Sequence, residues 1–139
     1  MANKIEGTIS SNKGFYIGDI CYALSDSIYD DVWGGSGYED GIHSVPESGY
    51  SFAVAGTAYG DGEYEDHQGR RYGVDAGNIG LVPEELAEDT DGGHYFEGGG
   101  EATFTAEDGV FEITLPSGEV VIIDTTEGGN FWEPDDLDY

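Results

Sequence analysis

Apolar and polar residues alternate most regularly in the last third of the chain. Three runs there are rich in the β-branched and aromatic residues that strands favour, and they cover 101–106, 110–115 and 119–125. The connections 107–109 and 116–118 are strong turn sequences, Glu-Asp-Gly and Pro-Ser-Gly. Because short turns join antiparallel neighbours, we predict a meander, with the most apolar run, 120–123, as a central strand.

The first two thirds of the chain contain shorter apolar runs broken by glycine. Tyr50, Phe52 and Val54 share one face of a long expected strand, and small residues occupy its other face. A polar connection follows, and 70–75 is expected to return beside the strand as a hairpin. Two glycine- and acid-rich segments are expected to be loops, 34–49 and 89–100. The expected strands of this part are 4–9, 14–18, 50–59 and 70–75.

One segment has the spacing of a helix. Ser25 is a suitable N-cap, and Leu24, Ile28 and Val32 fall on one helical face. The two glycines at 34–35 are expected to end the helix, because glycine is the usual residue just beyond a helix C-terminus.

Together these elements predict a mainly β fold of the α+β type. About seven short strands would form an antiparallel sandwich or a partly open barrel, with the helix packed on it. A chain of 139 residues can bury one modest core, so we expect a single domain over 1–132. The remaining residues, 133–139, form an expected acidic tail.

Charge is the extreme feature of the composition. Thirty Asp and Glu face four Lys and Arg, which gives a formal net charge of −26. Without clustered cations the chain is not expected to bind nucleic acid directly, and anionic membranes should repel it. Its expected partners are cations or basic protein surfaces. Adaptation to high salt or simple solubility would also explain acidity, although solubility needs a net charge of only about 2–8 in magnitude.

The chain has one cysteine, Cys21, so no intrachain disulfide can form, as is usual in a reducing compartment. The first ten residues lack the apolar run of a signal peptide, and no segment has the roughly 20 apolar residues of a membrane helix. We therefore expect a cytoplasmic protein without a cofactor. The sequence leaves its oligomeric state open.

Three glycine-containing motifs stand out: Phe-Tyr-Ile-Gly-Asp-Ile-Cys-Tyr at 15–22, Gly-Thr-Ala-Tyr-Gly-Asp-Gly at 56–62, and Tyr-Gly-Val-Asp-Ala-Gly-Asn-Ile-Gly at 72–80. In combination they resemble a family of small acidic proteins encoded by bacteriophages and their bacterial hosts. That family more often has proline where this chain has Ile20. The resemblance spans the first two thirds of the chain. It implies a phage or prophage product of unassigned function and no catalytic residue.

The expected hairpin concentrates charged side chains. They are Asp61, Glu63, Glu65, Asp66, His67 and Asp75. Converging carboxylates could hold a hard cation, but the sixth position of a calcium loop starting at Asp61 lacks glycine, and no close Cys/His pair suits zinc. Asp61, His67 and Asp75 could act in acid–base chemistry, although no nucleophile motif accompanies them. The other interpretation is a solvated tip whose acids are neutralised by Arg70 and Arg71, which point to opposite faces.

A second acid-rich segment, 89–101, contains Tyr95 and Phe96, which could anchor it to the core or to a partner. It begins like a calcium loop, but Gly100 takes the position of the closing acid. A surface loop without a binding role is equally consistent with this sequence.

The charge favours a non-enzymatic interaction protein. Carboxylates spread over a rigid β scaffold can imitate the phosphates of DNA, so we expect a phage-type inhibitor that binds a basic, nucleic-acid-binding host protein. The expected contact residues are Asp61, Glu63, Glu65, Asp66, Asp75, Tyr95, Phe96, Asp135 and Asp136. One alternative is a cation-dependent enzyme or a metal-binding protein that uses the hairpin 61–75. Another is a structural component that assembles through strand edges.

Overall fold

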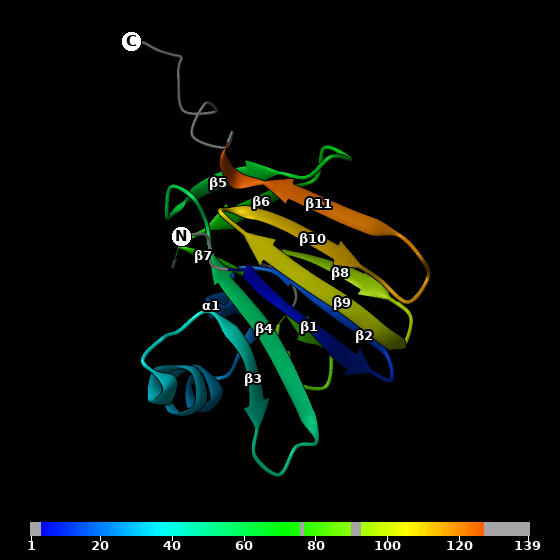
Figure 1. Ribbon diagram of the computed structural model, residues 1–139. Coiled ribbons are helices and arrows are strands. Elements are labelled where there is room, and N and C mark those ends of the chain that lie inside the picture. The colour runs from blue at the N-terminus through cyan, green and yellow to red at the C-terminus, as the bar shows by residue number, and fades with distance from the viewer. Residues whose placement is uncertain (1–3, 76, 90–92, 127–139) are drawn as a thin grey trace.

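The computed structural model describes residues 4–75, 77–89 and 93–126, and its described part is mainly β with antiparallel sheets, as predicted (Figure 1). One sheet has the order β1 (Lys4–Ser11), β9 (Gly100–Glu107), β10 (Val110–Thr114) and β11 (Val120–Asp124). A second has the order β3 (Gly41–Val45), β4 (Tyr50–Gly56), β7 (Asn78–Pro83), β2 (Gly14–Gly18) and β8 (Gly93–Glu97). A two-stranded hairpin contains β5 (Gly62–Glu65) and β6 (Arg71–Val74).

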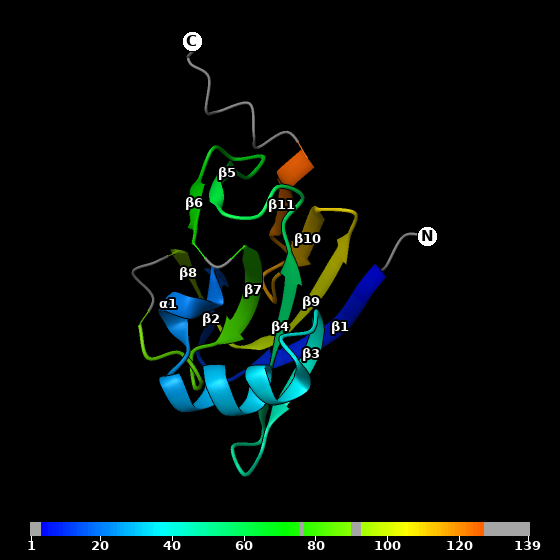
Figure 2. The ribbon, with the colours of Figure 1, turned by 90° about the vertical axis from the view of Figure 1, so that its left-hand side faces the viewer.

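The five-stranded sheet is the middle layer of the molecule. Its inner strands β4, β7 and β2 are buried on both faces, whereas its edge strands β3 and β8 are partly exposed. Its strand β2 shows this directly, since Phe15 and Ile17 face the four-stranded sheet whereas Tyr16 faces the helical segment. The predicted alternation in β4 is confirmed in the same way, with Phe52 and Val54 in the helical-side core. The layers are therefore sheet, sheet and helical segment, a sandwich without a closed barrel (Figure 2).

The predicted helix is present in an unusual form. A single turn, α1 (Ile20–Ala23), comes first, then the π-helix η1 (Ile28–Trp33) and the 3-10 turn η2 (Gly34–Ser36). Ser25 caps the segment as expected, since its Oγ accepts a hydrogen bond from the backbone N of Ile28 at 3.2 Å. The π-helix ends at Trp33 with Gly34 as its C-cap, at the expected position, and a 3-10 turn then follows that ends at Gly37, whose φ is 87°.

The carboxy-terminal meander is confirmed, but the position of its last strand is not. β9, β10 and β11 pair in sequence order, with β1 added beside β9. The prediction that 120–123 is a central strand is wrong, since β11 is the last strand of its sheet. The hairpin covers this edge, because Asp66 forms an isolated antiparallel bridge with Ile123. An apolar run thus marks burial and does not by itself indicate a central position.

The predicted pairing of 50–59 with 70–75 is also wrong. β4 pairs with β3 and β7, whereas β6 pairs with β5. The strand β7 is buried on both faces, so it lacks the alternation that would reveal it. Gly80 is required there, because a Cβ would lie 2.4 Å from Ile20 Cγ2 and 2.6 Å from the Ala53 carbonyl oxygen. The two expected loops likewise contain strands, β3 and β8.

Candidate functional site: the strapping hairpin and the acidic helical side

The β5–β6 hairpin is a strap across one open side of the sandwich. At its turn, the backbone N of His67 donates to the Ile122 carbonyl oxygen of β11 at 2.9 Å. At the start of β6, His94 of β8 donates through Nε2 to the Arg71 carbonyl oxygen at 2.8 Å. The hairpin therefore joins the two large sheets, and its Tyr64 and Tyr72 are buried in the core between them.

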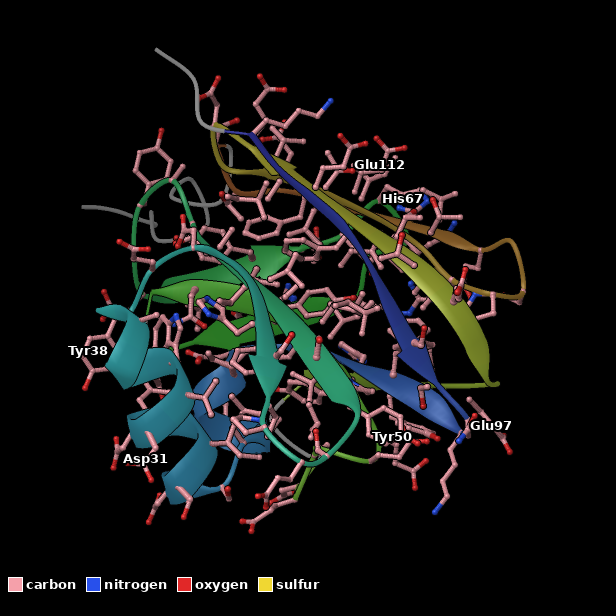
Figure 3. All side chains as sticks on the ribbon, turned by 60° about the horizontal axis from the view of Figure 1, so that its bottom comes forward. Asp31, Tyr38, Tyr50, His67, Glu97 and Glu112 are labelled. Atoms are coloured by element: carbon pink, nitrogen blue, oxygen red, sulfur yellow. The ribbon has the colours of Figure 1, made fainter. Side chains whose placement is uncertain are left out.

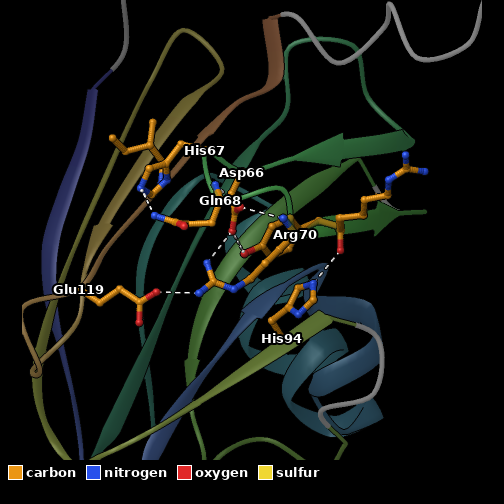
Figure 4. A network of polar contacts seen from close by, with 9 residues as sticks. Asp66, His67, Gln68, Arg70, His94 and Glu119 are labelled. Carbon is orange, nitrogen blue, oxygen red and sulfur yellow. Dashed lines mark hydrogen bonds and ion pairs between the residues drawn. The ribbon is translucent and has the colours of Figure 1, made fainter.

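Asp66 is the centre of a buried polar network at the turn (Figure 4). Its Oδ1 accepts from the backbone N of Gln68 at 2.8 Å and of Arg70 at 2.9 Å. Its Oδ2 accepts from Arg70 Nη1 at 3.0 Å and from the Tyr72 hydroxyl at 2.8 Å. Burial by itself raises the pKa of this carboxyl, but the hydrogen bonds from Tyr72 and Arg70 outweigh it and lower the pKa. Each oxygen of the Asp66 carboxylate thus accepts two hydrogen bonds from groups of the protein.

The arginines behave as the neutralising interpretation predicted. Arg70 also donates to Glu119 Oε2 at 2.7 Å, and its guanidinium lies 4.9 Å from the centre of the Phe96 ring. Arg71 lies on the opposite side, 3.5 Å from Glu63 and 3.6 Å from Glu65. The two arginines thus pair with three of the five carboxylates of 61–75 and with Glu119, so the charge of the hairpin is partly neutralised.

The three residues considered for acid–base chemistry do not come together. Asp61 and Asp75 flank the Gly62–Val74 pair at the open end of the hairpin, whereas His67 is in the turn beyond the Glu65–Arg71 pair. Three steps along the strands separate these ends, roughly 10 Å. Asp75 instead accepts a hydrogen bond from the Tyr22 hydroxyl. Within the described ranges, no group of three or more His, Cys, Asp or Glu side chains is placed to hold a metal ion.

The other expected contact residues fall in different places. Phe96 is half-buried against the core, whereas Tyr95 is 38% exposed and donates its hydroxyl to Glu84. That hydrogen bond is the main reason that the pKa of Tyr95 rises to about 12, with burial second. Asp135 and Asp136, and the whole tail 133–139, lie outside the described residues.

Sequence reasoning missed an acidic and aromatic surface on the helical side. Asp26, Asp30 and Asp31 are exposed along the segment, and Tyr38 just beyond it is 54% exposed. Figure 3 shows Asp31 and Tyr38 on this side of the molecule. The available signal was the run from Asp26 to Asp40, in which acids and tyrosines surround the apolar face of the expected helix.

This helical side has no basic residue to balance it. The ion pairs between described residues involve Lys4, Arg70 and Arg71, which belong to β1 and the hairpin. The carboxylates of 26–40 pair with none of them. The two regions thus differ in charge balance although both are rich in acid.

Comparisons of the chain with protein-family models, curated proteins and solved structures found no match. Among the described residues, no helix combines the length and apolar character that crossing a membrane requires.

Proposed function

We propose that this chain is a non-enzymatic acidic interaction protein that docks on a basic surface of a nucleic-acid-binding protein. Its carboxylates occupy positions that DNA phosphates would otherwise take on that surface. The resemblance to acidic proteins of bacteriophages suggests a phage-type inhibitor that acts in the host cytoplasm. In this proposal the chain itself binds neither nucleic acid nor membrane.

The observation that supports the proposal is that few of the described acids form an ion pair and that the acids of the helical side form none. Arg70 and Arg71 pair only with Glu63, Glu65, Asp66 and Glu119, and Lys4 pairs with Glu6, so most of the net charge of −26 has no cation paired with it among the described residues. A folded chain that only needed solubility would require a net charge of about 2–8 in magnitude. Unbalanced exposed carboxylates on rigid elements attract a basic partner at long range and accelerate association at low salt.

Exposed tyrosines accompany these acids. Tyr22, Tyr38, Tyr59 and Tyr95 are between 38% and 62% exposed, and each has a carboxylate nearby in sequence or in a hydrogen bond. Tyrosine is enriched among residues that dominate binding energy, because it offers a large rigid surface and a polar group. Carboxylates supply steering in this arrangement, and tyrosines supply contact area.

The experiment is affinity capture from bacterial lysate followed by displacement. The full chain is immobilised beside polyglutamate of matched charge, and retained proteins are eluted by a salt gradient or by a short DNA duplex. We expect a dominant basic protein that only this chain retains and that the duplex displaces. Identical capture on polyglutamate, or retention that the duplex leaves unchanged, would contradict the proposal.

A further inference from the structure

The outer face of the helical segment contains a depression. It has a volume of about 320 Å³ and is lined by Cys21, Leu24, Asp26, Tyr29 and Asp30. The two aspartates are exposed, whereas Leu24 is buried. The depression thus brings a leucine, a tyrosine and a cysteine together with two carboxylates.

The buried Trp33 fixes the aromatic side chains of the helical segment in place. Trp33 is buried in the helical-side core, and its Nε1 donates to the Glu39 carbonyl oxygen at 3.0 Å. Its ring meets those of Tyr29 and Tyr38 edge to face, both at centroid distances of 5.1 Å. The backbone N of Tyr38 also donates to the Trp33 carbonyl oxygen at 3.0 Å. The aromatic side chains of this face therefore lose little freedom when a partner binds.

We propose that this helical face docks an arginine-bearing segment of a basic protein, with one arginine side chain in the depression. The proposal rests on the proposed function and assigns the surface and the contacting residue type. Charge complementarity supports the occupant, because no Lys or Arg among the described residues pairs with the acids of 26–40.

Arginine suits the depression better than lysine. Its three methylenes can lie against Leu24, while its planar guanidinium can bind the carboxylates of Asp26 and Asp30 and lie on the ring of Tyr29. Lysine, a compact and strongly hydrated charge, cannot make two bidentate contacts and a ring contact at once. Tyr38 is exposed, and its ring centre lies 6.4 Å from that of Tyr29, so it offers a further contact to the chain that carries the arginine.

The test is a titration of the full chain, followed by backbone NMR shifts, with the peptide acetyl-Gly-Arg-Gly-amide. The matching citrulline and lysine peptides are the ligand controls. Asp30→Asn is compared with Asp31→Asn, which removes the same charge from the same segment but outside the depression. We expect Asp30→Asn to weaken binding about two- to fivefold and Asp31→Asn to leave it nearly unchanged.

Equal losses in the two variants would overturn the assignment, as would citrulline binding as tightly as arginine. Equal affinity for the lysine peptide would overturn the choice of arginine. If the captured basic protein binds Asp26→Asn/Asp30→Asn as tightly as the unaltered chain and DNA still displaces it, the docking face is wrong while the proposed function stands. If the arginine peptide binds but no captured protein is displaced by DNA, the proposed function fails alone.

Discussion

The hairpin and the helical segment contain the same kind of residue in opposite circumstances. In the hairpin, Asp66 is buried and receives hydrogen bonds from Arg70, Tyr72 and the backbone. In the helical segment, Asp30 is exposed and pairs with no Lys or Arg of the described chain. The role of an acid therefore depends on its partners. Asp66 stabilises the fold through its hydrogen bonds, whereas Asp30 keeps an exposed carboxylate that a partner could contact.

The physical difference is the cost of burial. A carboxylate taken out of water is destabilising unless charged and polar groups replace its hydration, and Asp66 has a full set of them. An exposed carboxylate keeps its water and costs the fold little except repulsion. It can exchange that water for a partner's cation, which Asp66 cannot do without breaking the strap.

The largest expected effect is on the strap. Asp66→Ala should lower the free energy of unfolding by about 3 kcal/mol, because it leaves Arg70 and the backbone donors without their buried partner. Glu65→Ala, which loses one exposed ion pair on the same hairpin, should cost less than about 1 kcal/mol. Urea unfolding followed by tryptophan fluorescence measures both. Equal losses in the two variants would mean that the buried network of Asp66 stabilises the fold no more than an exposed ion pair does.

The second effect concerns Cys21, beside the depression. Burial, then a hydrogen bond and the charge of Asp19, raise the pKa of its thiol from 9.0 to about 12. At neutral pH the folded chain should hold about a thousandfold less thiolate, the reactive form, than the chain in urea. The greater nucleophilicity of a more basic thiolate offsets part of this, so alkylation by iodoacetamide should be roughly 30- to 100-fold slower in the folded chain. Asp75→Asn should speed the folded-state reaction slightly, because the charge of Asp75 also raises this pKa. Equal rates in the folded and unfolded chains would contradict the negative, partly buried setting.

A third effect is the pH dependence of stability. The pKa of Asp66 is lowered from its ordinary 3.8, so the unfolded chain takes up this proton first as the pH falls. The stabilisation from the carboxylate is complete above the ordinary pKa and is lost as the pH falls through the folded value. Urea midpoints between about pH 5 and pH 2 should fall more steeply for the unaltered chain than for Asp66→Ala. Parallel curves would show that Asp66 does not titrate in this way.

The smallest effect is expected on the helical side. Glu39→Gln should change the free energy of unfolding by less than about 0.5 kcal/mol, because the Glu39 side chain is exposed. The change should be stabilising at low salt, where removing one negative charge relieves repulsion in a chain of −26, and should vanish at high salt. A destabilisation at low salt would show that this acid holds the fold together.

Much of the fold followed from local patterns. The meander was predictable because strong turn sequences separate alternating runs, and the helical segment because Ser25 precedes an amphipathic face. β7 was not predictable, since a strand buried on both faces shows no alternation and Gly80 resembles a turn residue. The pairing of β4 was missed for the same reason, because its true neighbour went unrecognised.

The features of the candidate site were likewise predictable only where they depended on nearby residues. That Arg70 and Arg71 would neutralise hairpin acids followed from charge and strand alternation, and the structure confirms it. That Asp66 would be buried did not follow, since the contacts of Tyr72 and the bridge to Ile123 join distant segments. The helical-side surface depended in turn on η1 folding over the middle sheet, which exposes one side of the helix and buries the other.

Residue type and neighbours within a few positions were enough to predict the charge, the β class, the helical segment and the turns of the meander. Only the tertiary structure decided which strands pair, which acid is buried and which acids remain unbalanced. The reason is that burial and ion pairing depend on distances between segments far apart in the chain, and local periodicity contains no record of those distances.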